Sequence, residues 1–305
     1  MTARRLRRAM DRIGVTLLSA VLLVWTLLPI YNIVRVSLQE KEEVLSTSVY
    51  PIAPSLHAFS VVFHQAYWLL ETFWNQMGNS FFIGVVVAVL TLSIGSLTSF
   101  TISRMRIRSG WMLTNAALLT YVIPLSFLAI PFYGIMGKYG LTNNPLSVIA
   151  VEVTFATPYA IFIFQQYGAS IPLELDEAAR IDGASPPQIF FRIYLPLMAP
   201  ALVAIGTYAL LLSWNEYLYA FLLLSGGKVV TVPVTLGKFL VGDEAPWNYL
   251  MAAAIIYAIP PLLIYYGFRR RMSGVTAAGH LRYPHVHGDL ALAAAGTALL
   301  NSGGR

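Results

Sequence analysis

Cysteine is absent from this 305-residue sequence, and charged side chains make up only 11% of it, against roughly 25% in a typical soluble domain. The lack of cysteine excludes disulfide bonds and thiolate metal sites. The shortage of charge accompanies 57% hydrophobic residues, which are gathered into long uncharged runs. A helix that crosses a bilayer needs about 20 mainly apolar residues, so these runs indicate a membrane protein rather than a soluble one.

The uncharged runs predict helices rather than strands. They do not alternate between polar and apolar residues as the strands of a membrane barrel do, and within lipid only helices and closed barrels satisfy their own backbone hydrogen bonds. Pro124 and Pro131 are expected to break the third span, because proline kinks a helix. We therefore expect an all-α polytopic membrane protein with six transmembrane helices, at about 13–34, 80–102, 111–134, 146–167, 198–222 and 249–268.

Basic residues are distributed unevenly about these spans. Fifteen of the 20 lysines and arginines lie before the first span or after the second, fourth and sixth, and Arg104, Arg106 and Arg108 are among them. By the positive-inside rule both termini are cytoplasmic, and an even number of spans agrees. Since topology accounts for the net charge of +6, no nucleic-acid partner is expected. Three parts follow, namely a basic cytoplasmic N-terminus at 1–12, a six-helix transmembrane domain at 13–272 and a flexible cytoplasmic tail at 273–305.

One segment between the fourth and fifth spans differs from the rest. Residues 172–196, PLELDEAARIDGASPPQIFFRIYLP, include six charged side chains. We expect a first helix that begins at Pro172, with carboxylates at its positive N-terminal end, and Gly183 in a left-handed turn just past its C-terminus. Ser185 and the proline after it suit the start of a second helix, which Pro196 is expected to stop. The segment therefore predicts two short helices joined by a sharp corner.

Local chemistry alone leaves two interpretations of this segment open. Leu173, Ala178 and Ile181 form a thin apolar stripe among charges, with Ala179 beside it, which suits docking into a polar-rimmed groove of another protein. An ordinary surface loop has the same composition.

The segment resembles the cytoplasmic coupling motif of ABC-importer permeases, whose pattern is E-A-A, then D-G-A, then a hydrophobic residue and L-P. We call residues 172–196 the coupling segment. Further stretches, including SWNEYLYAFLLL and TVPVTLGKF, extend the likeness over roughly Tyr31 to Thr276. The wider sequence is similar to the carbohydrate-uptake branch, in particular to the second permease of the maltose system. The residues that match the motif are Glu177, Ala178, Ala179, Asp182, Gly183, Ala184, Phe190, Ile193, Leu195 and Pro196.

The resemblance implies a non-catalytic transport subunit. The chain has no Walker-type phosphate loop, and the family implies that it binds no cofactor, while a separate ATPase dimer uses ATP and Mg²⁺. In this family the coupling helix sits in a groove of that ATPase, with Glu177 as its polar anchor, Gly183 as the corner, and Ala178 and Ala179 as the small face. The family also implies a second homologous permease subunit, an extracytoplasmic solute-binding protein, a small carbohydrate or polyol as substrate, surrounding lipid, and the inner membrane of a bacterium.

Ionisable residues within spans are candidates for the substrate pathway. Glu152 and Glu216 lie about six residues from the outer ends of spans four and five, roughly 9 Å deep at 1.5 Å per residue. Trp214, Asn215 and Tyr217, next to Glu216, offer ring faces and amide donors that suit a neutral polyol. An interfacial aromatic belt, with Glu216 paired to the sister subunit, fits the same residues.

Two other classes of protein fit the sequence less well. An ion-coupled secondary transporter is expected to contain inverted repeats, and none is evident. An intramembrane hydrolase needs catalytic groups paired at membrane depth, but no predicted span contains histidine, and Ser-Lys and Asp-Asp pairs are missing from the spans.

Overall fold

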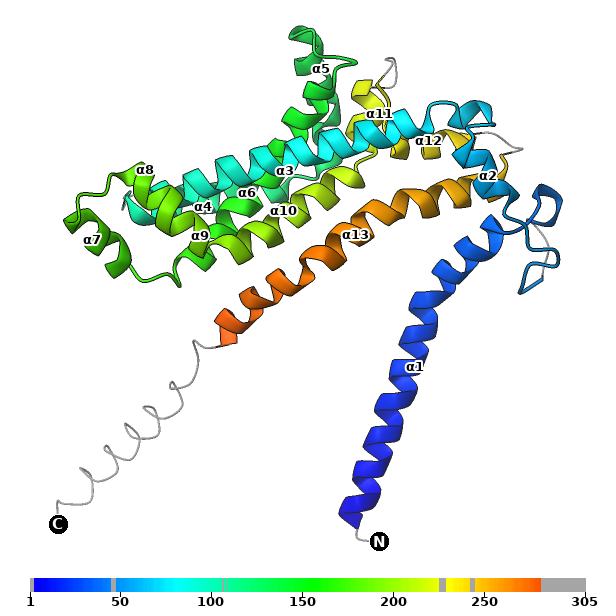
Figure 1. The fold of residues 1–305 in the computed structure, drawn as a ribbon, viewed down its shortest axis with the longest axis horizontal. Coiled ribbons are helices and arrows are strands. Elements are labelled where there is room, and N and C mark those ends of the chain that lie inside the picture. The colour runs from blue at the N-terminus through cyan, green and yellow to red at the C-terminus, as the bar shows by residue number, and fades with distance from the viewer. Residues whose placement is uncertain are drawn as a thin grey trace. The chain divides into compact units, whose positions relative to one another are not determined.

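The computed structural model describes residues 3–44, 48–105, 107, 109–224, 229–241 and 245–280. Helices dominate these residues, and no strand occurs among them, which confirms the all-α prediction. Short 3₁₀ and π turns join several of the helices. The α-helices, shown in Figure 1, are α1 (Ala3–Ser37), α2 (His57–Phe63), α3 (Phe73–Arg104), α4 (Gly110–Leu119), α5 (Ala129–Lys138), α6 (Pro145–Gly168), α7 (Glu174–Ile181), α8 (Pro186–Ile189), α9 (Leu195–Leu197), α10 (Ala199–Trp214), α11 (Leu218–Leu224), α12 (Val232–Lys238) and α13 (Trp247–His280).

The chain divides into two compact units, each built from separate stretches of sequence. Four of the dividing points fall within helices, namely α3, α5, α6 and α13, so these helices contribute to both units. The coupling segment lies wholly within the second unit. The first unit comprises Met1–Ile83, Tyr133–Val148 and Asn215–Leu262, and the second comprises Gly84–Phe132, Ile149–Trp214 and Leu263–Arg305.

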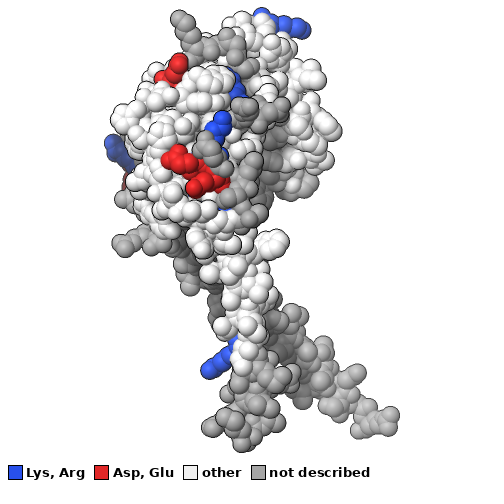
Figure 2. Space-filling model, turned by 90° about the vertical axis from the view of Figure 1, so that its right-hand side faces the viewer, with Lys and Arg blue, Asp and Glu red and all other residues white. Residues whose placement is uncertain are grey.

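Within the described residues, four helices are long and apolar enough to cross a membrane, and two bent pairs raise the number to six if each pair is one span. In the most apolar 18-residue window of α1, 0% of the residues are buried, whereas 50% are buried in that of α6. Few red or blue side chains interrupt the white ones on the face shown in Figure 2. The four helices are Arg12–Ser37, Trp68–Arg104, Pro145–Gly168 and Trp247–Phe268, which match predicted spans one, two, four and six.

The third predicted span is sharply bent. Its two halves, Met112–Val122 and Leu125–Lys138, meet at 89°, and Pro124 between them has an extended ψ of 128°. The prediction of a break at Pro124 is therefore confirmed. The prediction for Pro131 is wrong, because Pro131 is the third residue of α5. This proline lies where the 3₁₀ turn Leu125–Leu128 passes into α5, and proline is tolerated near the start of an α-helix.

The fifth predicted span is not one helix over 198–222. α10 ends at Trp214, and α11 starts at Leu218. Between them, Glu216 Oε1 accepts a hydrogen bond from the backbone N–H of Tyr219 at 2.8 Å, so a side chain satisfies a donor in the first turn of α11. The bend in this region instead lies earlier, at 78° between Pro186–Leu197 and Ala199–Trp214.

Close helix contacts build the core of the second unit. A Cβ added to Gly95 of α3 would lie 3.0 Å from the Cβ of Ala160 and 3.2 Å from the ring of Phe164, both on α6. Small residues allow membrane helices to approach this closely. Tyr194 and Met198 are fully buried in the same cluster, so the end of the coupling segment packs directly on these helices.

Polar side chains fasten the loops of the first unit. Asn79 donates to the carbonyl of Val230 at 3.0 Å, and the N–H of Val232 donates to Ser80 Oγ at 3.1 Å. These bonds join the start of α3 to Val230 and to the first residue of α12, where the backbone would otherwise leave polar groups unpaired.

The boundary predicted at residue 272 lies within α13, and the helix has no break there. α13 continues to His280. The rest of the predicted tail, residues 281–305, lies outside the described residues.

Candidate functional site

α7 and the turn after it form the first half of the coupling segment. α7 begins at Glu174, two residues later than predicted, and Pro172 lies just before its N-cap. At its C-terminus the N–H of Gly183 donates to the carbonyl of Arg180 at 3.1 Å, and the N–H of Ala184 donates to that of Ala179 at 2.9 Å. These are the two hydrogen bonds of a Schellman motif. Gly183 has a φ of +82°, which confirms the predicted left-handed turn.

The second half starts as the sequence predicts but does not end as predicted. Ser185 is the N-cap of α8, and its N–H donates to Gln188 Oε1 at 2.7 Å. The helix then continues through a π turn, Phe190–Tyr194, into α9. Pro196 therefore lies inside a helical stretch and does not stop it.

The π turn explains how Pro196 is accommodated. In a regular α-helix the proline ring would clash with the carbonyl four residues earlier. Here the N–H of Leu195 donates to the carbonyl of Phe190, five residues earlier, and this wider turn ends directly before the proline. The helix ends two residues after Pro196, at Met198, where ψ is −2°.

The coupling segment presents apolar side chains to its surroundings. Ile181 is 87% exposed, Leu175 is 44% exposed and Leu173 is 42% exposed. The two alanines of the motif divide between the two sides: Ala178 is exposed, whereas Ala179 is half-buried and packs against the core cluster. Among the other motif residues, Ala184 and Leu195 pack against the same cluster, and those exposed are Glu177, Asp182, Gly183 and Pro196.

A buried ion pair, which the sequence pattern does not predict, holds this segment. Asp176 Oδ2 lies 3.4 Å from Arg104 Nε, and the two side chains are 5% and 2% exposed. Arg104 Nη2 also donates to the carbonyls of Gly168 at 3.2 Å and Ile171 at 3.1 Å. The distribution of charges predicts only that Arg104 helps to orient the protein in the membrane. Nothing in a single sequence distinguishes Arg104 from the arginines at 106 and 108.

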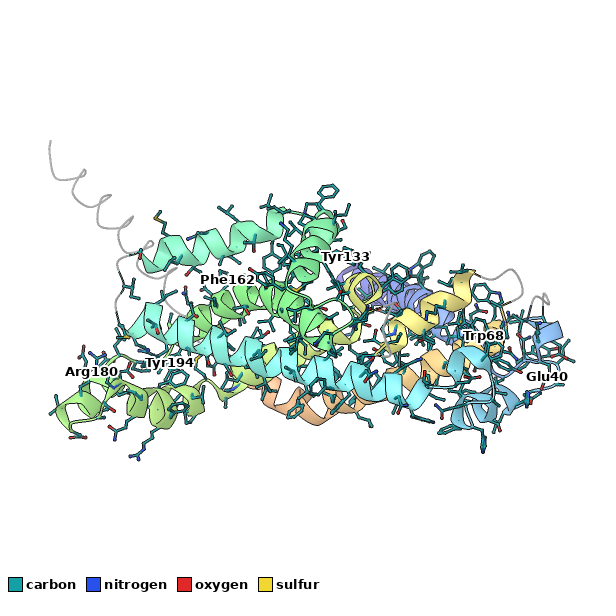
Figure 3. The ribbon with its side chains drawn as sticks, turned by 90° about the horizontal axis from the view of Figure 1, so that it is seen from above. Glu40, Trp68, Tyr133, Phe162, Arg180 and Tyr194 are labelled. Carbon is teal, nitrogen blue, oxygen red and sulfur yellow. The ribbon has the colours of Figure 1, made fainter. Side chains whose placement is uncertain are left out.

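Tyr194 attaches the second half of the segment to the same end of α3. Its ring centroid lies 5.6 Å from the guanidinium carbon of Arg104, within range of a cation–π contact. Its hydroxyl is 3.1 Å from Ser99 Oγ, and its ring meets Phe100 edge to face at 5.1 Å. Figure 3 shows Tyr194 and Arg180 at the same end of this helical group.

The candidate pathway residues fall into both units. Glu152 (1% exposed) and Trp214 (2% exposed) are buried in the second unit. Asn215, Glu216 and Tyr217 belong to the first unit. Glu216 is half-buried and caps α11, while Asn215 is exposed.

Tyr217 has a defined packing environment. It stacks on Phe221 with centroids 5.6 Å apart and 17° between the rings. A Cβ added to Gly237 would lie 2.5 Å from the Tyr217 ring, so this glycine allows the ring to lie against α12. Tyr217 and Phe221 are 42% and 41% exposed, and together they form an accessible aromatic surface. Sequence analysis named Tyr217 but missed Phe221 and Gly237.

Known proteins resemble the chain along most of its length. It is 30% identical over 277 residues to the inner membrane ABC transporter permease protein YcjP of Escherichia coli strain K12, which covers 90% of this chain and 98% of that protein. It is 29% identical over 256 residues to the arabinooligosaccharides transport system permease protein AraQ of Halalkalibacterium halodurans, which covers 82% and 90% respectively.

A solved structure shows the same fold. It is the crystal structure of a bacterial ABC transporter involved in the import of the acidic polysaccharide alginate, and one of its chains superposes with a TM-score of 0.70. The match covers 86% of this chain and 97% of that chain at 24% identity. The family model described as the binding-protein-dependent transport system inner membrane component matches residues 94–273, which include the whole coupling segment. The chain therefore belongs to this family of inner membrane components and is a permease of an ABC importer.

Proposed function

We propose that this permease carries a sugar or related polyol across the inner membrane of a bacterium, driven by ATP that a separate ATPase dimer hydrolyses with Mg²⁺. AraQ is named for arabinooligosaccharide transport, and a likeness over most of both chains supports a carbohydrate here. A carbohydrate is therefore the substrate class that we assign.

The corner of the coupling segment carries this proposal. Ile181 is 87% exposed, and apart from its neighbours in the chain no atom of the described residues lies within 4 Å of a Cβ position at Gly183. A large apolar side chain beside an open corner suits burial in a pocket of a partner. We assign that pocket to the ATPase, with Glu177 as the polar anchor at its rim. The termini and the coupling segment are then cytoplasmic.

The remaining partners follow from the family. A second homologous permease subunit completes the pathway, and an extracytoplasmic solute-binding protein delivers the substrate from outside. Asn215 and Tyr217 are our first candidates for contact with the substrate, because both are exposed and the Tyr217–Phe221 ring pair offers an apolar face to a sugar. Glu216 caps α11, so we assign it a structural role. Glu152 and Trp214 are buried, so we rank them after Asn215 and Tyr217 as candidates for contact with the substrate.

Cross-linking from the corner tests the proposal. The chain has no native cysteine, so Ile181→Cys provides one reactive thiol in the transporter assembled with its co-expressed ATPase. A reagent that carries a maleimide and a photoreactive group is expected to join this thiol to the nucleotide-hydrolysing subunit, which mass spectrometry identifies. Ile52→Cys is the matched control, because Ile52 is 67% exposed and lies in the loop assigned to the outer side. If neither variant captures the ATPase although both thiols react, the proposed docking is wrong.

A further inference from the structure

α7 depends on a polar contact for its attachment. Its eight residues are too few for a stable isolated helix, which needs about 12–15. Leu175 and Ile181 are exposed, so its large apolar side chains do not anchor it to the core. The buried residue of α7 is Asp176. The other contacts of the helix with the core come from the small Ala179 and from Arg180, which bonds the backbone of Arg104.

The partner of Asp176 joins three elements at once. Arg104 is the last residue of α3, and its Nε faces Asp176 at 3.4 Å. Its Nη2 bonds the carbonyl of Gly168, the last residue of α6, and the carbonyl of Ile171 in the linker. The planar fork of arginine suits several acceptors at once, and a cation at a helix C-terminus is favourable. One side chain therefore connects α3, α6 and α7.

Further contacts reinforce the same point of attachment. Arg180, in the last turn of α7, donates to the backbone carbonyl of Arg104 at 3.5 Å. Tyr194 lies against the Arg104 guanidinium and pairs with Ser99 of α3. Both halves of the coupling segment are thus fastened to the last turns of α3.

We infer that Arg104 and Asp176 are positioning residues that transmit the movement of α7 to α3 and α6. This inference rests on the proposed docking of the coupling segment to an ATPase. Separating a buried ion pair leaves two charges uncompensated away from water, which is strongly unfavourable. A displaced α7 therefore moves α3 and α6 with it, because that preserves the pair. The pair links the external ATPase to two of the membrane spans.

Asp176→Asn tests this role in the complete transporter in proteoliposomes. This change keeps the shape of the side chain and removes its charge. We expect ATP hydrolysis to persist while the substrate taken up per ATP hydrolysed falls about tenfold, a typical size for coupling between sites. Asp176→Glu should restore much of the loss. Glu71→Gln is the control, because it removes the same charge from an exposed side chain outside the coupling segment, and its uptake per ATP should equal that of the wild type.

A second measurement separates transmission from simple folding. With Ile181→Cys added, the Asp176→Asn variant should still cross-link to the ATPase as strongly as the parent does. Unchanged uptake per ATP in Asp176→Asn would overturn the inference. So would a loss of cross-linking together with uptake, because the pair would then only hold α7 in place. If the protein with Ile181→Cys as its single change fails to capture the ATPase, the proposed function is refuted instead.

Discussion

Gly168 and Tyr194 illustrate how tightly single residues fit beneath the coupling segment. A Cβ at Gly168 would lie 2.9 Å from Tyr194 Oη. Tyr194 is fully buried, and its hydroxyl has Ser99 Oγ as a partner at 3.1 Å. The hydroxyl therefore cannot move aside without giving up a buried hydrogen bond.

Gly168→Ala should destabilise the protein by about 1–3 kcal/mol, as overpacking of a filled core does. Thermal unfolding of the purified variant in detergent measures this effect. Gly134→Ala is the matched control, because no atom lies within 4 Å of a Cβ at Gly134 of α5. Alanine there should match or raise the wild-type melting temperature, since it favours helix. Equal melting temperatures for the two variants would show that Tyr194 relaxes freely.

Residues governed by their nearest neighbours were predictable from the sequence. Gly183 and Ser185 follow local rules for ending and starting helices, and both predictions are confirmed. The Arg104–Asp176 pair joins residues far apart in the chain, so no local rule reveals it. Pro131 was misjudged because the effect of a proline depends on its position in the helix, and that position is decided by where α5 begins.

At the scale of elements, the corner between α7 and α8 combines an unusual backbone with open surroundings. Gly183 has a positive φ, and so does Gly140 after α5. Both turns contain the same pair of hydrogen bonds, since Gly140 donates to Gly137 at 3.1 Å and Leu141 donates to Met136 at 2.8 Å. Apart from chain neighbours, neither glycine has an atom of the described part of the protein within 4 Å of a Cβ position. The chain thus contains two equivalent turns in different places.

Gly183→Trp should leave membrane insertion intact yet uncouple uptake from ATP hydrolysis. The ring would occupy the space into which the ATPase is proposed to fit, and the positive φ adds about 1–2 kcal/mol of backbone strain. Gly140→Trp suffers the same strain outside the coupling segment, so its ATP hydrolysis and co-purification with the ATPase should stay normal. Uptake and hydrolysis assays on both variants check this, and normal uptake by Gly183→Trp would count against docking at the corner.

The approach of α3 to α6 gives a second test at this scale. Gly95→Ala places a Cβ 3.0 Å from the Cβ of Ala160, so we expect a loss of about 1–3 kcal/mol in stability. Gly78→Ala in the same helix meets no atom within 4 Å and serves as the control. Urea or thermal unfolding of both variants measures the difference, and a Gly95→Ala protein as stable as the control would contradict this packing.

Long helices were easier to predict than broken ones. Uncharged runs predicted α3, α6 and α13 because length and hydropathy decide these elements. The break between α10 and α11 was missed, since it depends on the Glu216 side chain bonding the N–H of Tyr219. Such a bond competes with a continuous helix only when the surrounding packing favours it.

At the scale of the whole molecule, the uneven distribution of arginine predicts a definite orientation. Cysteine substitution tests it in cells, because the chain has no thiol of its own. A membrane-impermeant maleimide should label Ile52→Cys in intact cells, and should label Ile181→Cys only after the membrane is permeabilised. Both side chains are well exposed, so accessibility reports the side of the membrane and not burial. The opposite labelling pattern would show that the topology is the reverse of the predicted one.

Composition and charge predicted the class of molecule, while the candidate site depended on a motif. The fold class follows from the scarcity of charged residues, and the family is confirmed over residues 94–273. Pathway residues were harder to identify, because an acid such as Glu216 within an apolar run serves equally as a helix cap. The structure shows the capping bond, which the sequence does not predict.

The exposed apolar surface of α1 bears on how the protein is inserted into the membrane. None of the helix's most apolar stretch is buried by the other described residues, so its place in the membrane does not depend on packing against them. The nascent polypeptide can therefore be anchored at the translocon before the other helices have been synthesised. A charge placed in the middle of this stretch should appear as a biogenesis defect, with little protein reaching the membrane, rather than as a slower transporter.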